Sequence, residues 1–310
     1  MQTTIAIHKL TKNFGSLCVL RNLTLEVARG EIFGIVGPDG AGKTTLMRIV
    51  CGIVGPTAGK VEVCGIDTSI NSDTVREKIG YMPQQFSLYG DLTVLENIHF
   101  FADMYQVPKE QRKTHIKELL SFSRLIPYQK RLARNLSGGM QKKLALCCCL
   151  IHTPEVLVLD EPTTGVDPVS RRELWGIFYK LPSKGITIFL STPYMDEAER
   201  CNRVALLYKG ELLTCDTPTK IRDSLQDEVV ELHCSDIRRA RNILNRSREV
   251  KAVYPFGDAL HIIYRNLTKG RKETKNLFDS EGIEILRIQR VEPSFEDVFM
   301  SLMGVANVRC

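Results

Sequence analysis

The sequence predicts an α/β protein in which helices cover a largely parallel sheet, followed by a smaller α+β domain. Three observations support this prediction: a strand runs directly into a glycine-rich turn and a helix, further strands alternate with helical stretches, and the pattern changes near Thr217–Gln226. With 310 residues, 43% hydrophobic and 25% charged, the chain has an ordinary globular composition and the length of about two domains. We place the first domain at residues 1–222 and the second at 223–310.

The elements of the first domain follow from short apolar runs and from helical spacing. Leu92–Leu125 has helical spacing and many charges, so we expect a helical insertion there, within about 88–150. The other elements expected are the strands Glu31–Val36, Glu155–Leu159 and Gly185–Leu190, and the helix Thr44–Ile53 that follows the first strand.

The second domain is expected to have the order βαββαβ, which is that of a ferredoxin-like unit. Gly257 and Asp258 suit a tight hairpin between the second and third strands. Ser294 and Asp297 have the spacing of a capping box at the start of the last helix. The expected strands are Val229–Cys234, Val250–Pro255, Ala259–Tyr264 and Ile283–Val291, and the expected helices are Asp236–Asn245, Lys269–Ser280 and Ser294–Leu302.

Composition and charge argue against several classes of protein. The most apolar run, Leu144–Ile151, is far shorter than the roughly 18 residues of a membrane span. The first residues lack the apolar core and cleavage site of a signal peptide. The net charge of +6 includes no block of like charges, so we expect no nucleic-acid partner. These features predict a cytoplasmic chain.

A glycine-rich loop between the first strand and the first helix fits the pattern G-x-x-x-x-G-K-[ST]. Its glycines let backbone N–H groups surround phosphate oxygens, and the helix adds its positive end. Lys43 can reach the β and γ phosphates, and the Thr44 hydroxyl can ligate Mg²⁺. The residues expected to contact a nucleotide here are Gly37, Pro38, Asp39, Gly40, Ala41, Gly42, Lys43, Thr44 and Thr45.

Two carboxylates follow the buried strand that ends at Leu159. Asp160, at the strand end, can hold the Mg²⁺ shell, and Glu161 can act as general base on the attacking water. The alternative is a pair of surface acids with no chemical role.

Two adjacent glycines lie about 20 residues before the acidic pair, in the segment Leu136–Gln141. Ser137, Gly138 and Gly139 open the helix Met140–Ile151, whose exposed N–H groups and dipole can hold an anion. As an isolated pentapeptide this segment could be an ordinary N-cap and turn.

The order of these three motifs resembles that of the ATP-binding subunits of ABC transporters. The resemblance implies a P-loop NTPase fold of the ABC ATPase type, ATPase activity, and ATP with Mg²⁺ as ligands. It gives catalytic roles to Lys43, Gln84 and Glu161, and metal contacts to Thr44, Gln84 and Asp160. Phe14 matches the aromatic that stacks on adenine in the family, although a core phenylalanine is the alternative.

The resemblance also implies a dimer of ATPase domains. Gln84 matches the family's Q-loop glutamine, which senses the membrane partner, and Gly165–Pro168 resembles the D-loop. In the family two domains face each other head to tail, so one domain closes on the ATP held by the other. We therefore expect nucleotide contacts from Ser137, Gly138, Gly139 and Gln141.

Most of the chain resembles the multidrug-exporter branch, including daunorubicin-resistance-type subunits. Residues 81–98 and 165–175 carry this likeness, and residues 292–304 resemble the end of an accessory C-terminal domain. The resemblance implies an integral membrane permease as partner, contacted around Gln84–Asn97, and a place on the cytoplasmic face of the membrane.

One position departs from the family. A histidine is expected after the strand Gly185–Leu190, in a pattern like S-T-H-x-x-[DE]-E-A, but Pro193 stands there. Proline has no imidazole and no backbone N–H, so it cannot contact the γ phosphate or orient Glu161. We expect an impaired ATP site in this chain and favour a heterodimer with a second ABC ATPase over a homodimer. Pro193 could also simply end the strand.

Two other functions stay open. A regulatory ATP-binding subunit with little turnover would also fit Pro193. A soluble ABC ATPase that acts on ribosomes or nucleic acid commonly carries two cassettes, whereas this sequence has one phosphate loop.

Overall fold

The computed structural model describes residues 2–85, 88–225 and 227–308, and it divides into two units, Met1–Cys215 and Asp216–Cys310. Phe86 and Ser87, in the stretch that resembles exporter subunits, lie outside the described residues. So does Gln226, where the expected change of pattern ends.

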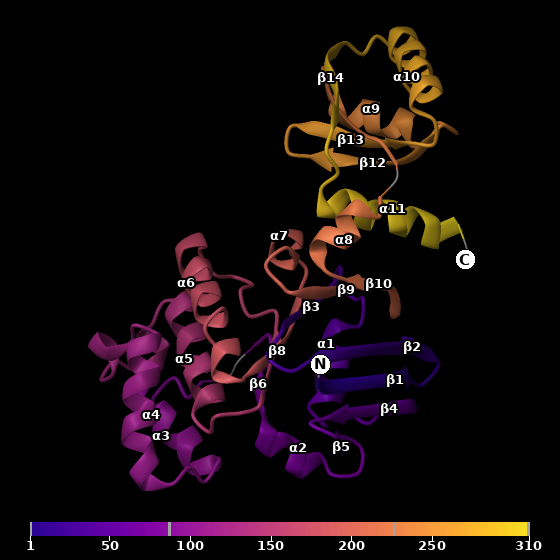
Figure 1. Ribbon diagram of the computed structural model, residues 1–310. Helices are drawn as coiled ribbons and strands as arrows, with labels where there is room; N and C mark the ends of the chain where they lie inside the picture. Colours follow the sequence, from indigo (N-terminus) through magenta and orange to yellow (C-terminus); the bar gives the residue numbers. More distant parts are fainter. Residues whose placement is uncertain (1, 86–87, 226, 309–310) are drawn as a thin grey trace. The chain divides into compact units, whose positions relative to one another are not determined.

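A mostly parallel sheet forms the centre of the first unit (Figure 1). Its strands are β3 (Ile32–Val36), β6 (Ile79–Met82), β7 (Val156–Asp160), β8 (Thr187–Thr192), β9 (Arg203–Tyr208) and β10 (Glu211–Asp216). They lie in the order β10-β9-β3-β8-β7-β6. Every residue of β3, β7 and β8 is buried, as expected of parallel strands with both faces covered.

The parallel register brings the carboxyl ends of three strands together. Val36 of β3 pairs with Thr192 of β8, and Asp160 of β7 pairs with Ser191 of β8. The loops that follow these strands therefore leave the sheet at the same edge, where open α/β sheets bind ligands.

The predicted helical region forms a bundle on one side of the parallel sheet (Figure 1). The helices of the unit are α1 (Lys43–Val50), α2 (Ser72–Lys78), α3 (Val94–Met104), α4 (Lys109–Phe122), α5 (Gly138–Leu150), α6 (Pro168–Phe178) and α7 (Met195–Ala198), with 3-10 turns at Ile126–Tyr128, Ala133–Asn135 and Pro182–Lys184. Helices α3, α4 and α5 share an apolar core that includes Ile98, Leu120 and Leu144. Helix α1 ends at Val50, earlier than expected, because Gly52 adopts a φ of +64°.

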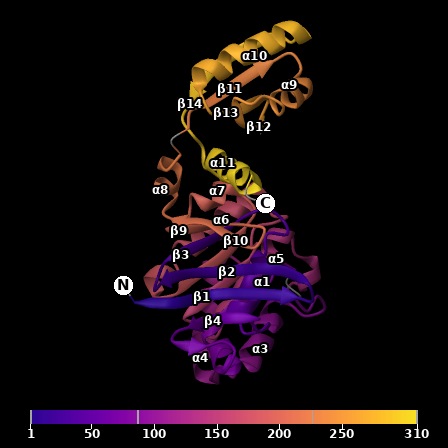
Figure 2. The ribbon, with the colours of Figure 1, turned by 90° about the vertical axis from the view of Figure 1, so that its right-hand side faces the viewer.

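The first unit also contains an antiparallel sheet that the sequence analysis does not predict. Its strands are β1 (Thr3–Phe14), β2 (Leu17–Ala28), β4 (Ala58–Val63) and β5 (Ile66–Asp67). They lie in the order β2-β1-β4-β5, and Figure 2 shows β1, β2 and β4 running beside one another. Several register shifts between β1 and β2 interrupt the alternation of buried and exposed residues, so the period of two is weak in the sequence.

The second unit is built around an antiparallel sheet in the order β12-β13-β11-β14. Along the chain its elements are α8 (Pro218–Asp223), β11 (Val229–Cys234), α9 (Ile237–Leu244), β12 (Val250–Phe256), β13 (Ala259–Tyr264), α10 (Leu267–Glu281), β14 (Ile285–Val291) and α11 (Phe295–Val308). The order strand, helix, strand, strand, helix, strand agrees with the predicted order. Within the ranges that the structure describes, no helix of either unit is both long and apolar enough to cross a membrane.

Helices cover both faces of this second sheet. Leu260 and Ile262 of β13 join the core formed with α9 and α10. Figures 1 and 2 show α11 on the other face of the sheet. The predicted hairpin turns at Gly257, which has a φ of +60°. The predicted capping box is also present, since Ser294 N–H donates to Asp297 Oδ2 (2.6 Å) and Asp297 N–H donates to Ser294 Oγ (3.2 Å).

Candidate functional site

The glycine-rich loop lies between β3 and α1, where the sequence places it. Gly40 and Gly42 adopt φ values of +78° and +104°, which favour glycine. A Cβ on Gly37 would lie 2.1 Å from the carbonyl oxygen of Leu207, so only glycine fits there. Lys43 is 4% exposed. Its Nζ donates to the carbonyl oxygens of Gly37 (2.8 Å) and Pro38 (3.0 Å), so the loop closes around this cation.

A cavity of about 350 Å³ opens beside this loop. Most of the residues that line it belong to the loop, the start of α1, or the predicted catalytic set. They are Val19, Asp39, Gly40, Gly42, Lys43, Thr44, Thr45, Gln84 and Glu161. Ala41 is buried instead and packs in the core.

The acidic pair is buried, so the alternative of two surface acids is wrong. Asp160 is 0% exposed and Glu161 5%. The Oδ1 atom of Asp160 accepts from Ser191 Oγ (2.6 Å), whereas its Oδ2 atom is buried without a hydrogen-bond partner among the described residues. Glu161 adopts a φ of +49°, which is strained for a residue with a side chain.

Three side chains face the Glu161 carboxylate. Lys43 Nζ lies 3.4 Å from Oε1, Gln84 Nε2 donates to Oε2 (2.9 Å), and Thr164 Oγ1 donates to the same oxygen (3.2 Å). The structure therefore brings together Lys43, Gln84 and Glu161, the three residues for which the resemblance implies catalytic roles.

Lys142 is a residue of this site that sequence reasoning missed. Its Nζ donates to the carbonyl oxygen of Gln84 (2.9 Å), so it fixes the backbone of the segment that carries Gln84. Burial lowers the pKa of Lys142, although the charges of Glu161 and Asp160 act to raise it. Its position directly after Gln141 was the available signal.

The Ser137–Gly139 segment does not line this cavity. Ser137 is exposed, and its hydroxyl caps α5 by accepting from Met140 N–H (3.4 Å), so the N-cap alternative describes its geometry. Gly139 packs so closely against α6 that a Cβ would lie 2.2 Å from Ser170 Oγ. The Gln141 amide donates to the Ala133 carbonyl (3.2 Å).

Phe14 lies at the end of β1 and is 51% exposed, so the alternative of a core phenylalanine is wrong. Lys12 Nζ lies 4.8 Å from the centre of its ring. The exposed ring is available as a stacking surface.

Pro193 follows β8 directly and is partly buried. The preceding residue, Thr192, accepts a hydrogen bond from Gly37 N–H at its carbonyl oxygen (3.4 Å). The backbone before Pro193 thus touches the phosphate loop, at the position where the family pattern expects a histidine.

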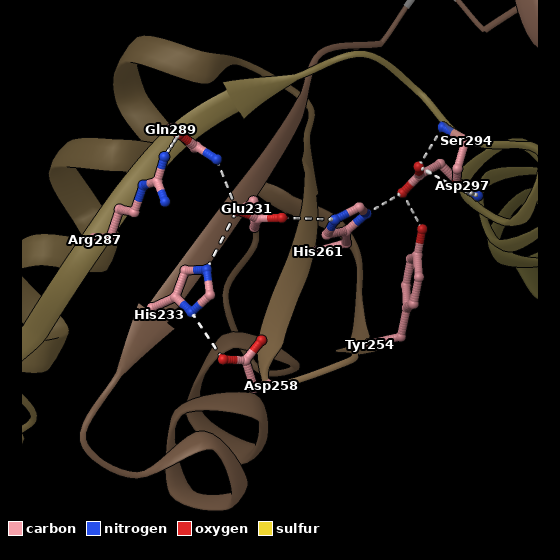
Figure 3. Close-up of polar contacts among 9 residues, drawn as sticks. All are labelled: Glu231, His233, Tyr254, Asp258, His261, Arg287, Gln289, Ser294 and Asp297. Carbon is pink, nitrogen blue, oxygen red and sulfur yellow. Dashed lines mark hydrogen bonds and ion pairs between the residues drawn. The ribbon is translucent and has the colours of Figure 1, made fainter.

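A second buried polar cluster lies in the second unit (Figure 3). Asp297 Oδ1 accepts from His261 Nδ1 (2.8 Å) and from the hydroxyl of Tyr254. Figure 3 shows Glu231 on the other side of His261, with its Oε2 3.8 Å from His261 Nε2. Among the described residues, no group of three or more histidine, cysteine, aspartate or glutamate side chains could hold a metal ion. Because Asp297 lies on α11 and His261 and Tyr254 lie on β13 and β12, these hydrogen bonds attach α11 to the sheet.

Comparison with known proteins shows that the first unit matches a known protein family. The sequence profile described as "ABC transporter" matches residues 20–164. The chain is 39% identical to the "Probable multidrug ABC transporter ATP-binding protein YbhF" of Escherichia coli (strain K12) over 97% of its own length, and it spans 52% of that protein. It is 32% identical to the "Nod factor export ATP-binding protein I" of Rhizobium etli, covering 97% of this chain and 94% of that one.

Solved structures show the same fold. One described as the "Structure of ATP binding subunit of ABC transporter" is 28% identical, with a TM-score of 0.66 over 71% of this chain and 92% of that one. The ATP-binding cassette MJ0796, bound to ADP and Pi in a dimeric post-hydrolysis state, is 28% identical, with a TM-score of 0.63 over 69% of this chain and 98% of its own.

Proposed function

The chain belongs to the ABC transporter family as an ATP-binding protein, and on that premise we propose that it is the ATP-hydrolysing motor subunit of a multidrug-like membrane exporter. The observation that carries the proposal is the meeting of Lys43, Gln84 and Glu161 at one cavity beside the phosphate loop. A cation, an amide and a carboxylate at that place suit phosphoryl transfer to water, which needs charge stabilisation and an oriented nucleophile.

Residues of this cavity, together with Asp160, also fit Mg²⁺, although Asp160 precedes Glu161 in the chain and does not itself line the cavity. Asp160 Oδ2 is a buried carboxylate oxygen that lacks a hydrogen-bond partner among the residues described, and Thr44 lines the cavity. Oxygen atoms are the ligands that Mg²⁺ prefers. We assign Thr44, Gln84 and Asp160 to hold the ion, which supplies charge neutralisation for the phosphates when it is bound.

We propose that a second ABC ATPase completes the site. The exposed Ser137 and the amino end of α5 are free to face another chain, where they would contact its nucleotide. Pro193 leaves this chain's own site without an imidazole, so a heterodimer in which the partner carries the histidine is favoured over a homodimer. A regulatory subunit with little turnover is the second candidate, and Pro193 is the observation that favours it.

We propose an integral membrane permease as the other partner, on the cytoplasmic face of the membrane. Three exposed large apolar side chains support this. Tyr89, five residues after Gln84, is 49% exposed, and Phe100 (38%) and Met104 (52%) lie one turn apart on α3. Tyr89 and Phe100 lie against each other, with ring centres 4.5 Å apart. An exposed apolar group of this kind marks a protein contact surface.

The second unit is proposed to be a ferredoxin-like accessory domain. Its element order and its antiparallel sheet order, β12-β13-β11-β14, support that fold.

Affinity purification of the tagged full chain from detergent-solubilised source membranes tests the function. We expect a multi-span membrane protein and a second ABC ATPase that has the histidine, both identified by mass spectrometry. Recovery of the membrane protein alone would indicate a homodimeric motor. Recovery of ribosomes or nucleic acid without a membrane protein would contradict the transport function.

A further inference from the structure

Glu197, on α7, is a buried carboxylate that accepts hydrogen bonds from three separate segments. It is 0% exposed. Its Oε1 atom accepts from Thr163 Oγ1 (2.6 Å) and Trp175 Nε1 (3.2 Å), and its Oε2 atom accepts from Thr192 Oγ1 (2.7 Å). A carboxylate without such donors would be costly to bury. These contacts therefore show a site that is organised around this one side chain.

Two of the donors lie close to the nucleotide cavity: Thr163 is in the loop that carries Glu161, and Thr192 ends β8 beside the phosphate loop. Thr163 comes two residues after Glu161, and the next residue, Thr164, donates to the Glu161 carboxylate (3.2 Å). Thr192 precedes Pro193, and its carbonyl oxygen accepts from Gly37 of the phosphate loop (3.4 Å). Glu197 thus fixes the loop that carries the proposed general base relative to the end of β8, which touches the phosphate loop.

The third donor connects the same carboxylate to α6. Trp175 lies on that helix, which begins after Asp167, the residue that caps it. Arg171, one turn earlier on α6, lies 3.7 Å from Glu197 Oε1 and stacks on the ring of Tyr194. The segment after Pro193 and the helix after Asp167 therefore share contacts with one another and with Glu197.

We propose that Glu197 is a positioning residue of the ATP site: it holds the Glu161 loop, the Thr192–Pro193 segment and α6 in one arrangement. It acts through the backbone of these segments and through Thr164, and it touches no reacting atom. The inference rests on the proposed function in one respect, which is that ATP binds at the phosphate loop. Glu197 matches the glutamate of the same family pattern in which Pro193 stands at the histidine position.

A matched pair of substitutions on β8 tests the proposal. Thr192→Val removes one hydroxyl that donates to Glu197, whereas Thr187→Val makes the same change in an equally buried residue on the same strand. The Thr187 hydroxyl accepts from Gly30 N–H (3.0 Å) and has no contact with Glu197. Each variant loses two hydrogen bonds of a buried hydroxyl, because Thr192 Oγ1 also accepts from Tyr194 N–H (3.1 Å) and Thr187 Oγ1 also donates to Thr4 Oγ1 (3.5 Å). Both variants are therefore expected to unfold at lower temperature.

Only Thr192→Val is expected to change the site. We expect kcat for ATP hydrolysis to fall about tenfold, the equivalent of one hydrogen bond, while KM for ATP changes less than about twofold. Trp175 is the single tryptophan of the chain, so its emission reports on Glu197 directly. Its spectrum in nucleotide-free protein, and its response to ATP, should change in Thr192→Val and not in Thr187→Val.

Glu197→Gln and Glu197→Ala complete the test. Glutamine keeps one acceptor oxygen, and the threonine hydroxyls can rotate to accept from its amide, so it should restore part of the activity that alanine loses. The proposal is overturned if Thr192→Val leaves kcat and emission unchanged, or if Thr187→Val lowers kcat equally. If neither the wild type nor any variant hydrolyses ATP, the proposed ATPase function fails. If Thr192→Val then still changes the tryptophan emission and Thr187→Val does not, the positioning role of Glu197 stands.

Discussion

The acidic pair at the end of β7 and the Asp297 cluster of the second unit are both buried, but their neighbours satisfy them to different degrees. Asp297 accepts from His261 and Tyr254 at one oxygen and from Ser294 at the other. Asp160 keeps one buried oxygen without a hydrogen-bond partner among the described residues, and Glu161 has a strained backbone. The Asp297 carboxylate is thus satisfied at both oxygens, whereas the Asp160 carboxylate is satisfied at one. Beside Asp297, His261 Nε2 is also buried without a hydrogen-bond partner among the described residues, 3.8 Å from Glu231 Oε2.

This difference separates a structural role from a functional one. Buried polar groups are nearly always hydrogen-bonded, so the unpartnered Asp160 oxygen, next to the cavity-lining Glu161, fits the proposed role as a ligand of Mg²⁺. Strained residues likewise concentrate at functional sites. A satisfied carboxylate such as that of Asp297 holds elements together, here α11 and the sheet. Substitutions should therefore change activity in the first cluster and stability in the second.

The largest effect is expected from Pro193→His. Restoring an imidazole after β8 should raise ATP turnover by about 10²-fold, the lower end of the range for general acid–base groups. Steady-state ATP hydrolysis by the full chain measures this. The double variant Pro193→His with Glu161→Gln is the control, because a gain that persists without the Glu161 carboxylate does not come from this site. An unchanged turnover would refute the interpretation that the missing histidine limits hydrolysis.

Asp297→Asn should destabilise the second unit by about 2 kcal/mol at pH 7, since hydrogen bonds to a charged acceptor are lost. Burial alone would raise the pKa of Asp297, but hydrogen bonds from His261, Ser294 and Tyr254 hold it below its ordinary value of 3.8. A lowered pKa contributes stability above the ordinary value, and this contribution is lost as the pH falls through the folded-state pKa. The difference between wild type and variant should therefore be full at pH 7 and shrink below about pH 4.

Hydrogen exchange of peptides from β12, β13 and α11 measures that difference. Asp236→Asn is the control, because the Asp236 carboxylate also accepts a backbone N–H at the start of a helix, from Arg239 of α9, but is exposed. Asparagine caps as well as aspartate, so this control should change little. Equal effects of both substitutions would show that the Asp297 cluster adds nothing beyond capping.

The sequence predicts those parts of the fold that local patterns dictate. Short apolar strands such as β7 and the helical spacing of residues 92–125 are strong signals. The antiparallel sheet was missed because register shifts interrupt the alternation in β1. The attachment of α11 could not be predicted either, since His261 and Asp297 are 36 residues apart and meet only in the folded sheet.

In the candidate site, too, the sequence predicts the residues that lie in local motifs and not those that act through distant contacts. Lys43 and Glu161 lie in motifs whose residue types and spacing state their chemistry, so the sequence indicates both. Lys142 and Glu197 act through contacts with distant segments, Gln84 in one case and Thr163 with Thr192 in the other. Lys142 directly follows Gln141, and Glu197 matches the glutamate of the family pattern around Pro193, but neither position shows which distant segment the side chain contacts.

The smallest effect is expected at the edge of the nucleotide site, where Phe14 offers a half-exposed ring. If adenine stacks on it, Phe14→Ala should raise the Kd for ATP about threefold to tenfold, the value of one aromatic contact. Competition with a fluorescent nucleotide measures the affinity. Leu17→Ala is the matched control, because Leu17 pairs with Phe14 in the register of β1 and β2 and is 65% exposed. Equal affinities for the wild type, Phe14→Ala and Leu17→Ala would show that adenine does not stack on Phe14.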